Sequence, residues 1–329
     1  MVPRLSLYFL GTPRVKLNEQ PVALDRRKMG ALLTYLSMER GQHQRASLSS
    51  LLWADYEQAK AYKNLRQTLW EIQRTLGENW LTTDRETIGL NHKADVQLDV
   101  ETFNSLVEKS RVEADPSLRT ALLVESATLY RNHFLTGFSL KDAHPFNEWA
   151  FSVSESLKRN LSYALTTLTT DYGSLRRPDQ AIPYASRLVA LDPLNEASHR
   201  QLMESYLQAG QQTAALKQYQ TLEQTLRQAL NLDPQPETRD LYKKIRKGEI
   251  QLLQVQPEEK TIAKKHNLSH PVSKFIGRAR EMNEIKHLLK TNRLVTLVGA
   301  GGIGKTSPWL RPGHSLTELF TDAVWFIAL

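Results

Sequence analysis

The most specific chemical pattern in the sequence is a glycine-rich loop near residue 300. Residues 299–306 fit G-x-x-x-x-G-K-[ST] and follow an apolar run, residues 294–298, that predicts a buried strand. In such a loop the glycines let backbone N–H groups surround phosphate oxygens, while a lysine and a hydroxyl serve the terminal phosphates and Mg²⁺. The predicted nucleotide-binding residues are Gly299, Gly301, Gly302, Gly304, Lys305 and Thr306, with Thr306 as the Mg²⁺ ligand. ATP or ADP with Mg²⁺ is the expected ligand, and no cofactor is required elsewhere.

The residues after this loop do not continue the pattern of an ATPase. Pro308 and Pro312 interrupt the helix that should follow, and a proline inside a helix costs about 3 kcal/mol. Residues 323–329 predict one more strand, beyond which nothing could supply a second acidic metal ligand or an arginine finger. We therefore expect no hydrolysis and no enzyme, and interpret the end of the chain as truncated or frameshifted, with residues 307–314 as the altered stretch.

A second chemical pattern lies in an amphipathic segment near residues 60–76. Leu65, Leu69, Ile72 and Leu76 recur at helical spacing and predict one buried stripe. The polar remainder suits nucleic acid, because Lys and Arg neutralise phosphates while Arg, Asn and Gln can pair with the edges of G or A. The candidate DNA-binding residues are Lys60, Lys63, Asn64, Arg66, Gln67, Arg74 and, outside this helix, Arg85. The alternative for the helix by itself is a solvated charged face.

The elements around this helix predict a small α+β domain. Apolar residues alternate in residues 5–9 and 15–24, which favours an antiparallel sheet with a turn at Asn18. Two helices should follow, with Asp25 and Ser47 as their N-caps, and a hairpin around Arg85 should come after the third helix. The three tryptophans of this region are interpreted as core residues: Trp53, Trp70 and Trp80.

The middle of the chain predicts helices with an internal repeat. Four pairs of like residues are each separated by 34 positions: Leu168 and Leu202, Tyr172 and Tyr206, Ala181 and Ala215, Leu188 and Leu222. This is the tetratricopeptide period, in which helix pairs bury their apolar faces against neighbouring pairs. A protein-binding surface is the functional interpretation, and a structural spacer is the alternative.

Composition excludes several classes of function. The chain of 329 residues has no cysteine, so disulfides, thiolate nucleophiles, cysteine-ligated zinc and iron–sulfur clusters are excluded. No apolar run approaches the ~18 residues that would span a bilayer, and the apolar stretch at the start is shorter than a signal-peptide core. None of the nine histidines has a recognisable ligand or triad spacing. We expect a cytoplasmic protein without a membrane partner.

Three segments resemble parts of a known family in the order that this family has them. Residues 1–98 resemble the OmpR/PhoB-type winged helix of SARP/AfsR-like activators, with LDRRKMGALLTYLSMERG as first helix and YKNLRQTLWEIQRTLG as recognition helix. Residues 99–250 resemble the bacterial transcriptional activator domain, most specifically in RQLMESYLQAGQQTAALKQYQTLEQTLRQALNLDPQPETRDLYKKI. Residues 275–329 resemble the opening of an AAA/NB-ARC-type signalling ATPase.

This resemblance implies how the protein would act. The third helix would lie in the major groove of double-stranded DNA, the turn at residues 84–86 would reach toward the minor groove or backbone, and copies would bind tandem sites. The helical segment would mediate dimerisation or contact with transcription machinery such as RNA polymerase. Arg85 is the only basic residue of that turn and stands between two acids.

The sequence therefore predicts a multidomain, mainly α protein. Its parts are a winged-helix α+β domain (residues 1–98), a tetratricopeptide-like all-α domain (99–250), a linker (251–274) and a partial α/β P-loop domain (275–329). The predicted function is that of a sequence-specific DNA-binding transcriptional regulator, an activator by its resemblance. The alternatives are a nucleotide-gated signalling ATPase whose first domains are adaptors, and a repeat scaffold that binds no nucleic acid.

Overall fold

The N-terminal sheet is built from the alternating residues at the start of the chain and from one strand much further on. The computed structural model describes residues 3–249, 265–266 and 323–324. Strands β1 (Arg4–Tyr8), β2 (Arg14–Leu17) and β3 (Gln20–Val22) are antiparallel, and β7 (Asp95–Leu98) joins β1 in parallel, giving the order β3-β2-β1-β7. Asn18 and Glu19 have φ of 49° and 65°, as a two-residue hairpin turn of matching twist requires. The sequence did not predict β7, because four residues before a helix carry little signal without β1 beside them.

Three helices and a second sheet follow. The elements are α1 (Arg27–Met38), β4 (Gln42–Gln44), α2 (Arg45–Leu52), α3 (Gln58–Leu76), η1 (Glu78–Trp80), β5 (Leu81–Thr83) and β6 (Thr87–Leu90). The strand order is β4-β6-β5. Strands β5 and β6 form the predicted hairpin, which is confirmed, and β4 pairs with β6 as a third strand that was not predicted. Gly89 allows this pairing, since a Cβ atom there would lie 2.3 Å from the carbonyl oxygen of Gly41.

The predicted helix N-caps were wrong at both positions. The N-cap of α1 is Arg26, and α2 follows Gln44, so that Ser47 lies inside its first turn; neither cap residue makes a side-chain cap hydrogen bond. Sheet pairing sets the start of α2, because the Arg45 N–H donates to the carbonyl of Glu86 at 2.8 Å. A contact distant in sequence replaces the local cap there.

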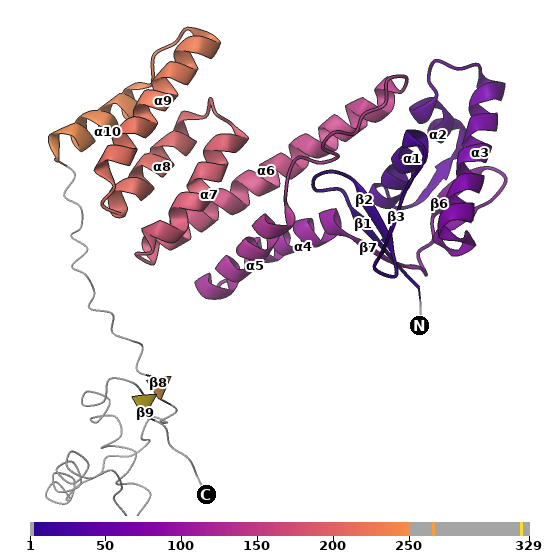
Figure 1. Ribbon diagram of the computed structural model, residues 1–329, viewed down its shortest axis with the longest axis horizontal. Coiled ribbons are helices and arrows are strands. Elements are labelled where there is room, and N and C mark those ends of the chain that lie inside the picture. The colour runs from indigo at the N-terminus through magenta and orange to yellow at the C-terminus, as the bar shows by residue number, and fades with distance from the viewer. Residues whose placement is uncertain (1–2, 250–264, 267–322, 325–329) are drawn as a thin grey trace, which may run out of the picture. The chain divides into compact units, whose positions relative to one another are not determined.

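Between Asp99 and Lys247 all the elements of the chain are helices. The helices are α4 (Asp99–Val112), α5 (Pro116–Leu129), α6 (His144–Ser174), α7 (Pro178–Leu191), α8 (Glu196–Gln208), α9 (Gln212–Leu230) and α10 (Pro236–Lys247). Consecutive helices from α6 to α10 pack against one another (Figure 1). The first residues of α7 and α9, Pro178 and Gln212, are 34 positions apart, whereas those of α8 and α10, Glu196 and Pro236, are 40 apart.

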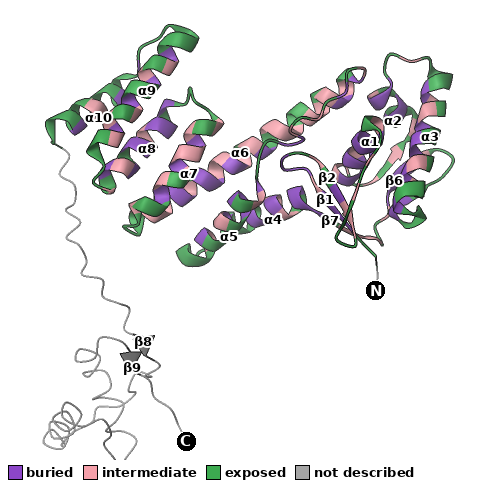
Figure 2. Ribbon diagram, in the orientation of Figure 1, coloured by how far each residue is buried: buried purple, intermediate pink, exposed green. Residues whose placement is uncertain are grey.

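A single hydrophobic core joins the N-terminal elements to the helices after them. It runs from Leu5 and Leu65 through Phe103 to Leu188, so it includes the N-terminal sheet, α1–α3 and α4–α7 (Figure 2). A smaller core, which contains Met203 and Tyr219, holds α8–α10 together. The scaffold of α3 is therefore continuous with the helical region.

Polar contacts reinforce this junction. The carboxylate of Asp99, at the start of α4, accepts hydrogen bonds from the backbone N–H groups of Phe9 (2.8 Å) and Leu10 (3.0 Å). Burial raises the pKa of Asp99, although these hydrogen bonds act in the opposite direction. Trp149 on α6 donates its Nε1–H to a carboxylate oxygen of Glu39 at 2.8 Å.

The chain divides into two units, residues 1–253 and residues 254–329. In the second unit the described residues are β8 (Lys265–His266) and β9 (Ala323–Val324), which pair in parallel. β9 falls in the stretch that the sequence predicts as a strand. The predicted nucleotide-binding residues and the altered stretch at residues 307–314 lie outside the described residues.

Candidate nucleic-acid interface

Helices α2 and α3 form a helix-turn-helix unit whose second helix is amphipathic. Leu65, Leu69 and Ile72 form the buried side of α3, which packs against α1 and α2. Trp53, in the turn between α2 and α3, is 5% exposed, and the ammonium group of Lys28 lies 5.5 Å from the centre of its ring. The buried stripe fixes the rotation of α3, so its opposite side is turned outward.

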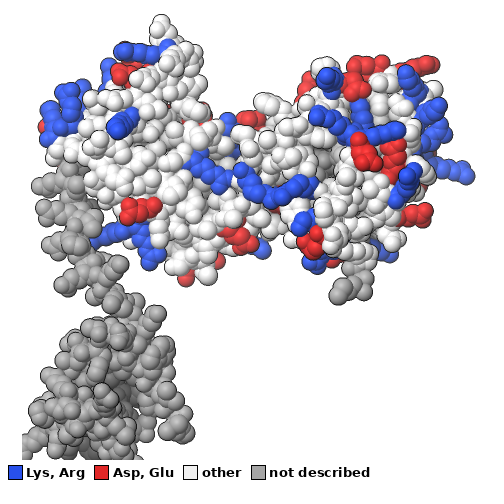
Figure 3. All heavy atoms as spheres, in the orientation of Figure 1, with Lys and Arg blue, Asp and Glu red and all other residues white. Residues whose placement is uncertain are grey.

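The structure brings most of the predicted contact residues to this outward side. Lys60, Lys63, Arg66, Gln67 and Arg74 are exposed, and Asn64 is partly buried at the border. In Figure 3, Lys and Arg side chains project along the right-hand edge of the molecule, where Figure 1 places α3. Within the described part of the chain, the outward side of α3 remains accessible rather than covered by α4–α10.

Two aromatic rings hold basic groups on this side of α3. The Lys60 ammonium lies 4.9 Å from the centre of the Tyr56 ring, and the Arg74 guanidinium lies 5.2 Å from that of Trp70. Such cation–π contacts are worth about 0.5–1 kcal/mol at exposed sites. They restrict the side-chain rotamers before any ligand arrives.

Glu71 places one negative charge at the edge of the basic surface. A carboxylate oxygen of Glu71 pairs with Nη1 of Arg26 at 2.9 Å and accepts from the Gln67 amide at 3.2 Å. Its second oxygen, Oε2, is buried without a hydrogen-bond partner in the described structure. Arg26 and Gln67 are therefore partly engaged within the protein.

The interpretation of Trp70 as a core residue was wrong. Its side chain is 56% exposed, whereas Trp80 is 2% exposed and donates its Nε1–H to the carbonyl of Leu76 at 2.7 Å. Composition cannot separate these two roles, and helical spacing gives only the direction of each ring, not whether another element covers it. Trp70 is one position away from the buried Leu69 and therefore points to another side of α3.

The Asp84 carboxylate accepts several hydrogen bonds at the hairpin tip after β5. The Asp84 carboxylate accepts from the N–H groups of Glu86 (2.7 Å) and Thr87 (2.6 Å) and from the Thr87 hydroxyl (2.7 Å). The Thr87 hydroxyl and these backbone groups lower the pKa of Asp84. The Arg45 guanidinium donates to the carbonyl of Asp84 at 2.8 Å, and Arg85 is exposed at the tip. Arg45 could not be found from the sequence, because its contact with the hairpin depends on the β4–β6 pairing.

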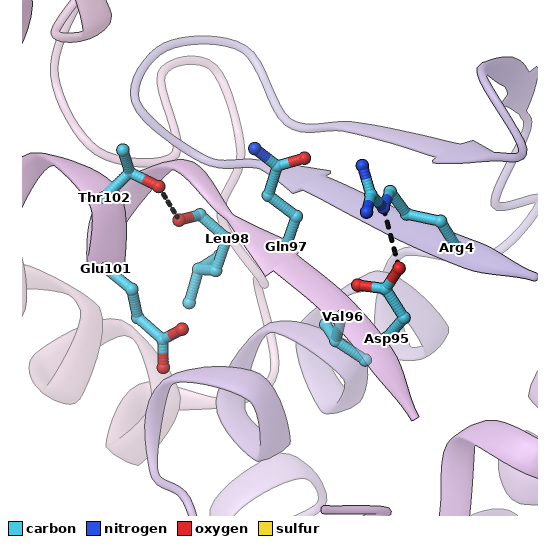
Figure 4. Close-up of a pocket in the computed structure, with 7 residues that line it drawn as sticks. All are labelled: Arg4, Asp95, Val96, Gln97, Leu98, Glu101 and Thr102. Atoms are coloured by element: carbon cyan, nitrogen blue, oxygen red, sulfur yellow. Dashed lines mark hydrogen bonds and ion pairs between the residues drawn. The ribbon is translucent and has the colours of Figure 1, made fainter. Parts of the chain in front are cut away.

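A hollow of about 340 Å³ lies beside β7 and the start of α4 (Figure 4). Its lining residues are Arg4, Asp95, Val96, Gln97, Leu98, Glu101 and Thr102. Arg4 and Asp95 pair with each other at 2.8 Å, which raises the pKa of Arg4 through the hydrogen bond with that carboxylate. This hollow is separate from α3 in sequence; its one hydroxyl, that of Thr102, donates to the carbonyl of Leu98 at 3.2 Å, and its side chains form no metal-ligand set.

Other types of site find no support in the part of the chain that the structure describes. No group of three or more His, Asp or Glu side chains there could hold a metal ion. No helix among the described residues is long and apolar enough to span a membrane. The outward side of α3 is thus the surface with the clearest chemical character.

Comparison with known proteins agrees with this arrangement. Residues 98–246 match the family "Bacterial transcriptional activator domain". The chain is 22% identical over 342 residues to the regulatory protein AfsR of Streptomyces coelicolor, an alignment that covers 97% of this chain and 33% of that protein. It is 27% identical over 244 residues to the transcriptional regulatory protein MoaR1 of Mycobacterium tuberculosis, with 72% of this chain and 77% of that protein covered.

The fold is also similar to a solved structure. Mycobacterium tuberculosis EmbR, in complex with a low affinity phosphopeptide, superposes with a TM-score of 0.59 and 19% sequence identity, covering 75% of this chain and 66% of that one. Residues 98–246 thus match a bacterial transcriptional activator domain, in a chain that is similar to the regulatory proteins AfsR and MoaR1. The chain spans about a third of the length of the AfsR proteins.

Proposed function

We propose that the chain binds double-stranded DNA in a sequence-specific way through α3 and activates transcription. The observation that carries this proposal is the outward, basic side of α3 in a helix-turn-helix unit that is fused to an activator-type helical domain. AfsR and MoaR1 are named as regulatory proteins, which supports the same function here. The regulator needs no catalytic step, and we propose that it is not an enzyme.

The exposed side chains of α3 suit a major groove, which is wide enough to admit an α-helix. Lys60, Lys63 and Arg66 would neutralise phosphates near the start of the helix, and phosphate contacts fix the register of a protein on the duplex. Gln67 carries the donor and acceptor pair that matches the edge of adenine. Arg85 at the hairpin tip would add a backbone or minor-groove contact, with Arg45 holding that tip in place.

The helical region would bind protein. The 34-residue spacing of like residues in the sequence and the packing of consecutive helices from α6 to α10 support this, because stacked helical repeats present extended surfaces to partners. We propose a second copy of the chain on tandem DNA sites, or RNA polymerase, as the partner. The whole protein would act in the cytoplasm.

The predicted phosphate loop at residues 299–306 would bind ATP or ADP with Mg²⁺. The loop pattern supports this part of the proposal, and the AfsR alignment extends over 97% of the chain. Binding of a fluorescent ATP analogue to the full chain and to Lys305→Ala would test it. DNA affinity should be equal with and without the nucleotide.

The central test measures how DNA binding depends on salt. Lys63→Ala and Arg66→Ala should each weaken binding to a selected duplex by about three- to tenfold near physiological salt, because each removes one phosphate contact. The slope of log K against log salt should fall by about one unit for each variant. Lys217→Ala, an equal charge change at an exposed position of α9, is the matched control and should leave both quantities unchanged. Equal losses in all three variants, or no loss in any, would show that α3 is not the DNA-binding surface.

A further inference from the structure

A large apolar side chain lies among basic and amide side chains on the outward side of α3. Trp70 is 56% exposed, although burial of an indole ring is strongly favourable. Gln67 lies one turn before it and Arg74 one turn after it, and both are exposed. Tryptophan and arginine are enriched at positions that a binding partner buries. An exposed tryptophan beside an exposed arginine is therefore typical of a contact surface.

The rotation of α3 places Trp70 at the centre of its outward side. At about 100° per residue, Trp70 and Arg74 each lie within about 20° of the direction of Lys63. Leu65 and Ile72, in the buried stripe, point to the opposite side of the helix. A groove that received Lys63 and Arg74 would therefore receive the indole ring as well.

The internal contact of Trp70 leaves most of the ring available. The Arg74 guanidinium stacks 5.2 Å from the ring centre, which orients both side chains but does not bury the indole. An apolar group in the major groove has one apolar target on the base edges, the C5-methyl group of thymine. Glu71, on the flank of the helix, is occupied by Arg26 and does not cover the ring.

We infer that Trp70 is a specificity-determining residue that contacts a thymine methyl group in the major groove. This inference rests on the proposed function, because it assigns one base-reading contact to the same helix. Lys63 and Arg66 would supply sequence-independent affinity through phosphates, and Trp70 would favour T·A over C·G at one position of the site. Arg74 would be held beside that position by its stack on the indole.

The test combines a protein change with removal of the methyl group from DNA. A duplex selected by the full wild-type chain is resynthesised with each thymine replaced in turn by deoxyuridine, and dissociation constants are measured at fixed salt. For the wild type, one or two replacements should weaken binding about fourfold, the value of one buried methyl group. For Trp70→Ala the same replacements should have no effect, while Trp70→Phe should retain part of the discrimination.

Leu118→Ala is the matched control, because Leu118 is also 56% exposed but lies on α5 in the helical region. It should keep the wild-type deoxyuridine profile. Thermal unfolding should be alike in all variants, since both positions are exposed. The slope of log K against log salt should be unchanged in Trp70→Ala, because no phosphate contact is removed.

Several outcomes would overturn the inference. If Trp70→Ala had the wild-type deoxyuridine profile, the ring would not contact a methyl group. If Trp70→Ala lowered the salt slope by about one unit with an unchanged profile, the ring would serve only to position Arg74. A wild-type chain that selects no sequence would overturn the proposed function as well, whereas selection without any deoxyuridine effect would overturn this inference alone.

Discussion

The exposure and ion pairing of the charged side chains on α3 depend on where each lies around the helix. Lys63 and Arg66 are exposed and free to meet phosphates, whereas Glu71 is half-buried and pairs with Arg26. The Glu71 carboxylate thus binds the Arg26 guanidinium and the Gln67 amide within the protein. The balance of these charges sets the electrostatic attraction of the surface to DNA.

Glu71→Gln is expected to tighten DNA binding. The change removes a negative charge near phosphates and releases Arg26, so affinity at low salt should rise about two- to fivefold. The slope of log K against log salt should become steeper by up to about one unit if Arg26 then meets a phosphate. Fluorescence anisotropy across a salt series measures both. Weaker binding would show that the Arg26–Glu71 pair positions α3.

At the scale of elements, a buried histidine joins α8 to its neighbours. His199 is 1% exposed; its Nε2–H donates to the carbonyl of Pro193 at 3.1 Å, so Nδ1 accepts from the Gln218 amide of α9 at 2.8 Å. Burial lowers the pKa of His199 below 6.5, against the effect of these hydrogen bonds. The neutral ring is therefore part of the packing between α8 and α9.

The stability of the helical region should consequently fall in mildly acidic solution. The pKa of His199 is lower in the folded protein than in the unfolded chain. The stability that the neutral ring contributes is therefore present above the unfolded pKa near 6.5 and is lost as pH falls through the folded pKa. The slope attributable to His199 is at most about 1.4 kcal/mol per pH unit. Urea unfolding from pH 7.5 to 5 measures the slope, and His199→Gln should lack it. The same slope in both proteins would assign the effect to other groups.

At the scale of the unit formed by residues 1–253, the N-terminal sheets and α1–α3 share one hydrophobic core with α4–α7. Their shared core and the hydrogen bonds from Phe9 and Leu10 to Asp99 cross the boundary suggested by sequence. Helices α4–α7 therefore pack on the same core that supports α3.

Asp99→Ala tests this junction. Two buried backbone N–H groups would lose their acceptor, so the free energy of unfolding should drop by about 2–4 kcal/mol. Chemical denaturation followed by far-UV circular dichroism measures the loss. Glu108→Ala, on the exposed side of the same helix, where it pairs only with Arg111 of α4, is the control and should cost less than about 1 kcal/mol.

Separating residues 1–98 from the helical region should also lower the melting temperature. Residues 1–98 alone should melt at least about 10 °C below residues 1–249, because the cut exposes apolar surface of the shared core. Residues 1–249 should show one main transition by calorimetry. An isolated winged helix as stable as the longer chain would contradict the shared-core account.

The sequence alone was sufficient for the local patterns. The buried stripe of α3, the hairpin around Arg85 and the helices of the middle region could be predicted, because each depends on a short-range pattern of apolar and turn-forming residues. The candidate contact residues followed from the same periodicity, since a buried side implies an exposed one. Five of the six candidates on α3 are exposed, with Asn64 at the border.

Only the tertiary structure decided what depends on neighbours distant in the chain. Strand β7 exists because β1 lies beside it, Arg45 supports the hairpin because β4 pairs with β6, and Trp70 is exposed because no other element covers that side of α3 in the described structure. An isolated sequence segment encodes its own periodicity but not the surface that packs against it. That physical difference explains why the position of α3 was predictable, whereas the surroundings of Trp70 were not.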